Sequence, residues 1–515
     1  MVLALIVAAL LAVYAYAAIP GAMLRAIPAL PPISAPEGLR TTPNGTAVPS
    51  LDTVYIFHQL IDHTNPGLGT FQQRYWMDWE YYKPGGPIIF MTPGEVNAEN
   101  YTGYLTNVTI NGLIAQQQNG AAVIIEHRFF GLSNPYPNLS SQSLAVLTIQ
   151  QAIDDLVYFA QQANLPMPGG DNVKPNTTPW ILVGGSYSGA LTAWTMVNQP
   201  GIFYAGYSSS GVVEAITDYW AYFKPIQEYM PQNCSADVQS VIAYLDGLYA
   251  ANDTQGLQDL KSTFGLGGLS HIDDFANALE GTLFEWQSLQ PDTGPGAMFF
   301  QFCDALEVKN GQIAGPEGWG LQNAIQAWGG FWNSTFYQYV CGNTDAETCL
   351  GTYNASQSYW TSTAVNNNAR SWTWMVCNQV GYYQDGPPVG QPAIVSRILT
   401  PEFFERQCVN MFPQKFSSPP QPAVAQVDQE YEGWGVEVDR LFFANGQRDP
   451  WREATVSSDF IYKASTDTQL IYVGDGFHCS DLSTENGVVD ATIANVQSAA
   501  LGYMKTWLAA WTPST

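Results

Sequence analysis

One short segment, Gly184–Gly189, constrains the fold of this chain more than any other feature. It reads Gly-Gly-Ser-Tyr-Ser-Gly and follows the apolar run 180–183, and a second apolar stretch comes after it. A buried strand, a tight turn with small residues around one serine, and a helix together form a nucleophile elbow. The small neighbours are needed because the serine adopts a strained backbone conformation. We therefore predict that Ser186 is a nucleophile. Ser188 fits the G-x-S-x-G pattern less well, since Ser186 and Ala190 would then occupy both glycine positions.

A serine nucleophile needs an acid and a histidine, and an α/β-hydrolase supplies them later in the chain in that order. Of the five histidines, only His271 and His478 follow Ser186. His271 begins a polar helical stretch, where a capping or surface role is expected. His478 comes after the strand-like run 469–473 and a short loop, where the last strand of such a sheet delivers its base. We predict His478 as the general base.

The acid is expected just beyond the preceding strand. The apolar run 441–444 is such a strand, and Asp449 follows it in a polar loop. We therefore predict Asp449 as the acid. Asp475 and Asp481 are closer to His478 in sequence, but we expect both to be solvated loop carboxylates.

This assignment predicts acyl transfer through a covalent intermediate. The serine attacks a carbonyl carbon, the histidine takes its proton, and the aspartate orients the imidazole. The main-chain N–H of Tyr187 is expected to form one half of the oxyanion hole. The second donor should come from the loop after the strand predicted at 87–91, which places Gly94 and Glu95 in that role.

The chain is long enough for more than one packing unit. Ser186 and Asp449 are separated by far more chain than one crossover helix and strand require. We therefore predict an α/β-hydrolase fold with a large, mainly helical cap inserted between late strands of the sheet. An independent helical domain elsewhere on the surface is the alternative. The catalytic domain is expected at 51–212 and 431–515, and the cap at 213–430. Helical apolar spacing within the insertion covers 238–250, 256–264 and 275–289.

The start of the chain predicts secretion. An apolar stretch ends at Ala15-Tyr16-Ala17, a cleavage pattern that makes 1–17 a signal peptide. The alternative, a membrane anchor, is disfavoured because the stretch is short and Pro20 follows. Residues 18–50 are rich in proline, so we expect an extended or mobile segment, which is either a pro-segment or a tail.

The remaining composition agrees with an extracellular protein, or with one from an acidic lysosome- or vacuole-like compartment. The net charge of −26 excludes nucleic acid as a partner, and no later segment is apolar for long enough to cross a bilayer. Nine N-x-S/T sequons predict glycosylation. They lie at Asn44, Asn100, Asn107, Asn138, Asn176, Asn233, Asn252, Asn333 and Asn354. The sequence does not indicate an oligomeric state.

Seven cysteines suit an oxidising compartment, and no C-x-x-C pair suggests a zinc or thioredoxin site. His58 and His63 lack a carboxylate at suitable helical spacing, so no metal is expected. The odd count leaves one thiol, which we assign to Cys479 because it lies far from the others. Proximity in sequence suggests the pairs Cys234–Cys303 and Cys341–Cys349.

Several motifs together resemble a known family. They are Thr70–Trp76, Glu126–Gly131, Gly184–Trp194, Asn445–Trp451 and Gly476–Leu482. In this order they resemble the lysosomal Pro-X carboxypeptidase family of serine peptidases, and the secreted fungal acid prolyl endoproteases look like the nearest branch. The resemblance implies cleavage on the carboxyl side of proline, without metal or organic cofactor, in proline-containing peptides or unfolded polypeptides. It also supports a Cys377–Cys408 disulfide.

The predicted S1 pocket is aromatic. Tyr187 and Trp451 flank the catalytic residues and are expected to hold a flat, apolar proline ring, with Ala190 beside them. Alternatively, Trp451 packs beneath its loop. The family's exopeptidases commonly have glycine at 188, methionine at 190 and a second histidine at 479, so their pocket cannot simply be copied onto this chain.

Three alternatives to a prolyl endoprotease remain: a proline-specific exopeptidase, a secreted esterase or lipase, and a noncatalytic binding protein. An exopeptidase needs a charge that captures a substrate terminus, for which Glu95, Glu126, Arg128 and Arg448 are the candidates. The acidic surface suits work at acid pH. However, Asp449 favours the charged form of His478, which opposes catalysis there.

Overall fold

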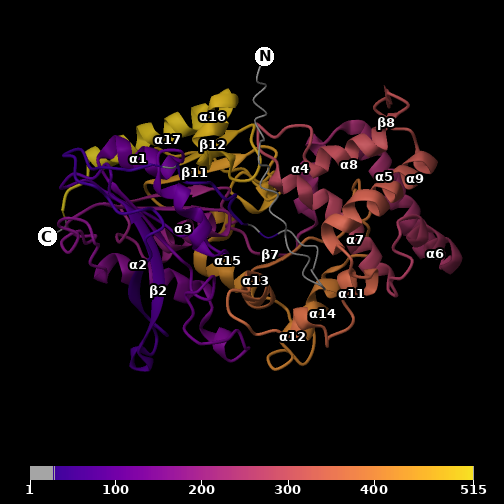
Figure 1. Cartoon of the computed structure of the whole chain (residues 1–515), viewed down its shortest axis with the longest axis horizontal. Coiled ribbons are helices and arrows are strands. Elements are labelled where there is room, and N and C mark those ends of the chain that lie inside the picture. Colours follow the sequence, from indigo (N-terminus) through magenta and orange to yellow (C-terminus); the bar gives the residue numbers. More distant parts are fainter. Residues whose placement is uncertain (1–26, 28, 37, 514–515) are drawn as a thin grey trace, which may run out of the picture.

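The computed structural model describes residues 27, 29–36 and 38–513, and every structural statement below refers to these residues. The chain has an α/β-hydrolase fold, in which helices cover both faces of a central sheet and a helical cap extends from one side (Figure 1). The sheet is built by the early and late parts of the chain, on the left of the figure, and the cap by the middle part, on the right. The predicted signal peptide lies outside the described residues.

Eight strands form the main sheet of the described chain, in the order β1-β2-β4-β3-β5-β6-β11-β12. The β1–β2 and β2–β4 pairs are antiparallel, and all pairs from β4 to β12 are parallel. The strands are β1 Tyr55–Leu60, β2 Thr70–Asp78, β3 Ile88–Met91, β4 Ala121–Ile125, β5 Trp180–Gly185, β6 Ala205–Ser209, β11 Leu441–Gly446 and β12 Gln469–Gly474. Since β6 pairs directly with β11, the cap is inserted between two neighbouring strands.

The central strands are apolar throughout because both faces of the sheet are covered. Residues of α1 and α17 pack on one face, and those of α2 and α3 pack on the other, in a core that continues into the cap. The helices of this part are α1 Ile110–Gln118, α2 Ile149–Gln162, α3 Tyr187–Asn198, α16 Thr484–Val489 and α17 Ala491–Ala509.

The insertion is mainly helical. Its helices are α4 Phe223–Tyr229, α5 Gln232–Ala250, α6 Thr254–Thr263, α7 Ile272–Phe284, α8 Met298–Glu307, α9 Leu321–Phe331, α10 Tyr337–Cys341, α11 Ala346–Leu350, α12 Ser358–Thr361, α13 Asn368–Met375, α14 Pro401–Met411 and α15 Val424–Tyr431. Its strands are the parallel pair β7 Ile216–Asp218 and β10 Gly381–Tyr383 and the antiparallel pair β8 Val308–Lys309 and β9 Gln312–Ile313. The helix predicted at 275–289 is α7 followed by a 3₁₀ helix, η5 (Glu285–Ser288).

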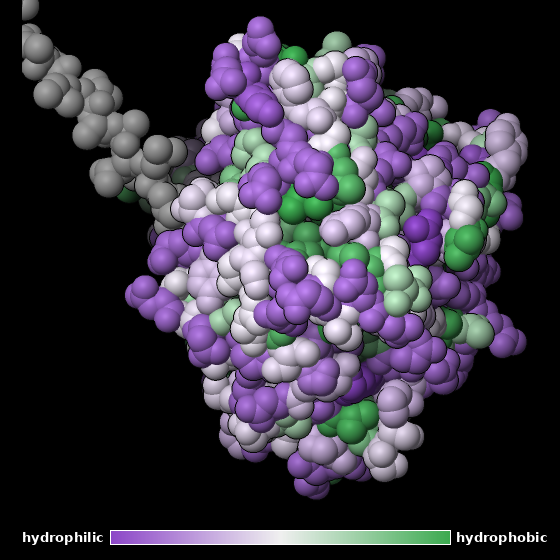
Figure 2. All heavy atoms as spheres, turned by 90° about the vertical axis from the view of Figure 1, so that its right-hand side faces the viewer, coloured by the Kyte–Doolittle hydropathy of each residue, from purple (hydrophilic) through white to green (hydrophobic). Residues whose placement is uncertain are grey.

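The surface of the cap end is mostly hydrophilic, as the predominance of purple residues in Figure 2 shows. No helix of the described residues has both the length and the apolar character that a bilayer crossing requires. The segment before β1 is less free than expected. Thr41 forms a β-bridge with Ala47 within the segment itself. Leu30 is 2% exposed and packs in the core of the catalytic domain, so part of this proline-rich stretch is bound to the rest of the protein.

Candidate active site

The elbow at Ser186 is a strand–turn–helix. β5 ends at Gly185, α3 begins at Tyr187, and Ser186 between them has a φ of 61° and a ψ of −127°. A positive φ is strained for a residue with a side chain. The main-chain N–H of Ser186 donates to the carbonyl of Ser209 in β6 at 2.8 Å, which helps to hold this conformation. Residue 184 must be a glycine, because a Cβ there would overlap the carbonyl of Ser188.

The structure places Ser186, Asp449 and His478 in contact. The Nε2 atom of His478 lies 2.7 Å from Ser186 Oγ, and its Nδ1 atom lies 2.9 Å from Asp449 Oδ1. Since the carboxylate can only accept, Nδ1 carries the hydrogen, and Nε2 is left to take the proton of the serine. All three side chains are buried. The three side chains thus have the hydrogen-bonding order that a nucleophile, a base and an orienting acid require.

The charge state of His478 depends on its neighbours. Burial lowers the pKa of His478, but Asp449 and Cys479 act in the opposite direction and leave it raised well above its usual value. The thiol of Cys479 is itself buried, and this burial raises its pKa. The imidazole therefore holds its proton more firmly than a free histidine does.

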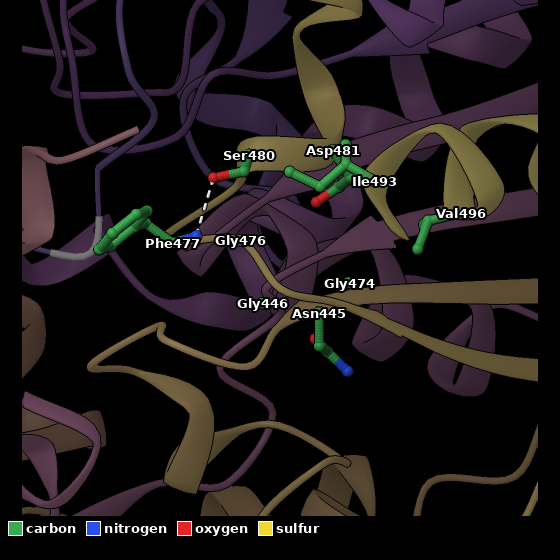
Figure 3. A pocket seen from close by; sticks show the side chains of 9 residues that line it. All are labelled: Asn445, Gly446, Gly474, Gly476, Phe477, Ser480, Asp481, Ile493 and Val496. Carbon is green, nitrogen blue, oxygen red and sulfur yellow. Dashed lines mark hydrogen bonds between the residues drawn. The ribbon is translucent and has the colours of Figure 1, made fainter. Parts of the chain in front are cut away.

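The turn that carries His478 is held by its own hydrogen bonds (Figure 3). The main-chain N–H of Phe477 donates to Ser480 Oγ at 2.9 Å, and a small cavity lies behind this turn. Asp481 lines this cavity and accepts hydrogen bonds from the hydroxyls of Tyr207 at 2.6 Å and Ser209 at 2.7 Å.

The expectation that Asp481 is solvated is wrong. Strand β6 places hydroxyl donors against its carboxyl group, and burial raises its pKa to about 6. Asp475, in contrast, is partly exposed and pairs with Arg448 at 2.6 Å. Neither residue contacts His478 as Asp449 does.

The loop after β3, which holds the predicted oxyanion residues Gly94 and Glu95, lies close to the elbow. Gly94 has a φ of 76°, and a Cβ there would lie 3.3 Å from both Tyr187 Cδ1 and Ser188 Cβ. Glu95 is 2% exposed, and neither of its carboxyl oxygens has a hydrogen-bond partner among the described residues. Burial raises the pKa of Glu95 well above its usual value, although nearby His478 acts in the opposite direction. The carboxyl group of Glu95 therefore holds its proton more firmly than that of an exposed glutamate.

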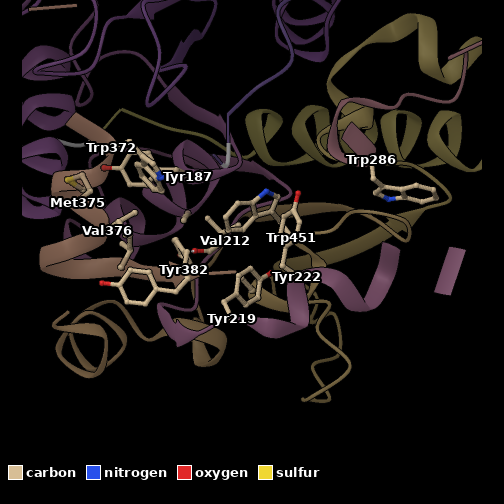
Figure 4. Packing of buried hydrophobic residues seen from close by; sticks show 14 of the residues in the cluster. Tyr187, Val212, Tyr219, Tyr222, Trp286, Trp372, Met375, Val376, Tyr382 and Trp451 are labelled. Carbon is tan, nitrogen blue, oxygen red and sulfur yellow. The ribbon is translucent and has the colours of Figure 1, made fainter. Parts of the chain in front are cut away.

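Aromatic rings from both domains surround the elbow (Figure 4). Tyr187 packs edge-on against Trp372 with 5.3 Å between ring centroids, and Tyr382 packs edge-on against Trp451 at 5.4 Å. The Trp451 ring also lies 6.4 Å from that of His478. Ala190 occupies the first turn of α3, in the same buried core. We call Tyr187, Trp372, Tyr382 and Trp451 the aromatic wall.

Sequence reasoning missed Trp372 and Tyr382, because both come from the cap. Tyr382 belongs to β10, and β10 pairs with β7. Strand β7 is the first element after the chain leaves the catalytic domain. The hydroxyl of Tyr382 donates to the carbonyl of Val212 at 2.6 Å, and the φ of Tyr382 is 58°. No local motif signals these two positions.

Sequence reasoning also missed the support of Tyr187 by His127. Burial lowers the pKa of His127 to about 4, so this imidazole is neutral. Its Nδ1 donates to the carbonyl of Arg128 at 2.9 Å, so Nε2 accepts the hydroxyl of Tyr187 at 3.1 Å.

The cap contacts both catalytic loops through η5 and the residues that follow it. Trp286 Nε1 donates to the carbonyl of Arg448 at 2.8 Å, and Gln290 Nε2 donates to the carbonyl of His478 at 3.2 Å. Gln287, which lies between these two residues in sequence, accepts a hydrogen bond at Oε1 from Trp451 Nε1 at 2.7 Å. Ser186 is fully buried, and these contacts join the cap to the loops that carry its two partners.

The cysteines pair as the sequence predicts, and the predicted glycosylation sites are accessible. The structure forms the disulfides Cys234–Cys303, Cys341–Cys349 and Cys377–Cys408, and Cys479 is a buried free thiol. None of the nine sequon asparagines is buried, and Asn44, Asn100, Asn176, Asn252, Asn333 and Asn354 are exposed.

Comparison with known proteins identifies the family. The family model described as serine carboxypeptidase S28 matches residues 59–496. This chain belongs to the S28 family. A similar protein is serine protease vicPb from Bipolaris victoriae (strain FI3), which is 33% identical over 473 residues, covering 88% of each chain. S28 membership and the Ser186–His478–Asp449 geometry make this chain a serine-type peptidase.

Two further similar proteins have informative names. The probable extracellular serine carboxypeptidase of Arthroderma benhamiae is 31% identical over 472 residues, covering 85% of this chain and 64% of that protein. The lysosomal Pro-X carboxypeptidase of Homo sapiens is 25% identical over 511 residues, covering 93% of each chain. This S28 chain is therefore similar over most of its length to peptidases of different organisms.

Proposed function

We propose that this S28 peptidase hydrolyses peptide bonds on the carboxyl side of proline, including internal bonds, and that it works outside the cell or in an acidic compartment. The aromatic wall beside Ser186 carries this proposal. A proline side chain is a flat, apolar ring without a backbone donor, and rigid aromatic faces can enclose it without hydrogen bonds. The similarity to proteins named as a Pro-X carboxypeptidase and as an extracellular carboxypeptidase agrees with this substrate and location.

In the proposed reaction, Ser186 Oγ attacks the carbonyl carbon that follows the proline side chain. Its proton passes to His478 Nε2 and then to the leaving nitrogen, so the peptide bond breaks and an acyl-enzyme forms. Water then attacks the ester with the same base, and the serine is regenerated. The main-chain N–H of Tyr187 and the protonated carboxyl of Glu95 donate to the oxyanion.

We expect activity at acid pH because of the role proposed for Glu95. A carboxyl group donates a hydrogen bond only while it keeps its proton, and an ionised Glu95 would repel the oxyanion. Activity should therefore decline as pH rises through the raised pKa of Glu95. His478 imposes the opposite requirement, because it must lose its proton to act as a base.

An exopeptidase needs a free charged group to bind a substrate terminus. In this chain most of the candidate groups are paired with other side chains, which favours cleavage of internal bonds. Glu126 is paired with Arg74 at 2.6 Å, and Arg128 donates through Nε to buried Asp155 at 2.7 Å. Arg448 is paired with Asp475. Three of the four candidate groups for a substrate terminus are thus engaged, and the fourth, Glu95, lies at the triad.

A blocked peptide with one central proline tests the proposal. At mildly acidic pH, mass spectrometry of the products should show a single cut after proline, and a peptide with alanine in that place should be cut about 10–200-fold more slowly. Cleavage elsewhere would refute the specificity. Cleavage only after one terminus is unblocked would identify an exopeptidase, and hydrolysis of simple esters alone would identify an esterase.

A further inference from the structure

The N-terminal part of the described chain, residues 27 and 29–36, lies against the catalytic domain. Tyr101 donates its hydroxyl to the carbonyl of Leu30 at 3.0 Å, and Tyr104 donates to the carbonyl of Pro31 at 2.7 Å. Both tyrosines belong to the 3₁₀ helix η2 (Ala98–Leu105). Residues 31–36 alternate between half-buried and exposed, as expected for an extended chain. We call residues 27 and 29–36 the docked segment.

The other end of the docked segment reaches the cap at the active site. Gln287 Nε2 donates to the carbonyl of Ile27 at 2.7 Å, while its Oε1 accepts from Trp451 of the aromatic wall. The side chain of Leu30 fills the space beside Gly185, the residue before the nucleophile, where a Cβ would overlap it. The docked segment thus runs from Gln287 in the cap, beside the aromatic wall, to the elbow in the catalytic domain.

We call the surface that the docked segment covers, which includes Tyr101, Tyr104 and Gln287, the groove, and its chemistry favours a particular kind of ligand. The side-chain hydrogen bonds from Tyr101, Tyr104 and Gln287 all go to main-chain carbonyls of the docked segment, so they recognise a backbone rather than particular side chains. Proline has no N–H but keeps its carbonyl, so donors of this kind bind a proline-rich stretch as well as any other. The docked segment itself includes Pro31 and Pro32.

We propose that this groove is a subsite for an extended, proline-containing stretch of a polypeptide substrate, and that the docked segment occupies it in competition with substrate. The proline-containing ligand rests on the function proposed above. A long substrate can occupy the groove and the catalytic residues at once, whereas a short one cannot, so the groove should affect long substrates more than short ones. The N-terminal segment therefore acts as an internal competitor until it is removed or displaced.

Cutting the chain after the docked segment tests the competition. A site for a specific processing protease can be inserted between Gly38 and Leu39, since Leu39 is fully exposed. After cleavage and removal of the freed segment, kcat/KM for a long proline-rich polypeptide should rise at least about tenfold, as expected when three hydrogen bonds no longer compete. A short blocked substrate should change much less. Equal kinetics before and after removal, for both substrates, would overturn the proposal.

Binding in trans tests the groove without relying on cleavage. A fluorescent peptide with the sequence of residues 27–36 should bind the cut Ser186→Ala protein, and the Tyr101→Phe/Tyr104→Phe double variant should bind it about tenfold more weakly. The control Tyr244→Phe alters an exposed cap tyrosine outside the groove and should leave binding unchanged. No binding, or equal binding by the double variant, would refute the subsite.

The two proposals can fail separately. If the short blocked substrate is not cut after proline, the proposed specificity is wrong, yet the peptide should still bind the groove. If proline cleavage is normal but the peptide neither binds nor competes with the long polypeptide, the groove proposal is wrong.

Discussion

The hydroxyl of Ser188 hydrogen-bonds to both main-chain groups of Gly185. It donates to the carbonyl at 2.8 Å and accepts from the N–H at 3.0 Å. Ser188 thus supports the elbow from the helix side, and its oxygen is not directed at His478. This explains how the turn tolerates a serine where the motif normally has glycine.

The two serines should therefore respond differently to substitution. Ser186→Ala should abolish labelling by a fluorophosphonate and lower kcat on the order of 10⁶-fold, while the protein still folds. Ser188→Ala removes two hydrogen bonds at about 1 kcal/mol each, which should lower thermal stability but keep labelling. Labelling that persists in Ser186→Ala and disappears in Ser188→Ala would place the nucleophile at 188.

Glu95 should control the pH profile. Glu95→Gln keeps a donor that cannot ionise, so its kcat/KM should extend to higher pH than that of the parent enzyme. Glu95→Ala removes the donor and should lower kcat about 10²–10³-fold at the optimum. Stopped-flow or steady-state profiles across the acid and neutral range measure both effects. An unchanged profile in Glu95→Gln would exclude Glu95 from the oxyanion hole.

Several buried carboxyl groups should make the fold more stable in acid. Burial raises the pKa of Asp385 to about 9, with help from Asp218, and those of Asp274 and Asp428 to about 7. A group whose folded-state pKa is raised stabilises the protein below its unfolded-state pKa, and this contribution is lost as pH rises through the folded-state value. The melting temperature should therefore fall as pH rises from the unfolded-state pKa of an aspartate, about 4, to about 9.

The variant Asp385→Asn tests the cause of that fall. An amide stays neutral at all these pH values, so the decline of the melting temperature at neutral and higher pH should become shallower. Asp345→Asn is a suitable control, because Asp345 is exposed at a helix start and its pKa is lowered by Thr348. A melting temperature that rises with pH in the parent protein would contradict the prediction.

The cysteines should differ in their reactivity toward alkylating agents and in how much their substitution destabilises the protein. Cys479 should be alkylated only after denaturation, since it is buried. The Cys377→Ser/Cys408→Ser variant should lose roughly 3–4 kcal/mol of stability, because this disulfide closes a 31-residue separation. Cys377 lies in the π-helix Val376–Val380, directly before β10, so KM for proline substrates should also rise as Tyr382 loosens. Peptide mapping that finds Cys479 oxidised would refute the assignment.

The sequence predicted the parts of the site that follow strand ends, and it missed the parts that depend on docking. Ser186, Asp449 and His478 each follow an apolar run, so the order of strands along the chain was enough to bring them together. Trp372, Tyr382 and Gln287 lie in a cap whose orientation depends on contacts distant in sequence. The carboxyl of Asp481 was misjudged for the same reason, since its donors belong to another strand.

The pairing of β6 with β11 also determines when the enzyme can first act during its own synthesis. A ribosome completes the strand before the cap, then the whole cap, and only afterwards the strand that pairs with β6. The nascent chain therefore carries its serine through the entire cap without the aspartate or the histidine. Since His478 follows β12, a fragment that ends within the cap contains only Ser186 of the three residues of the proposed triad.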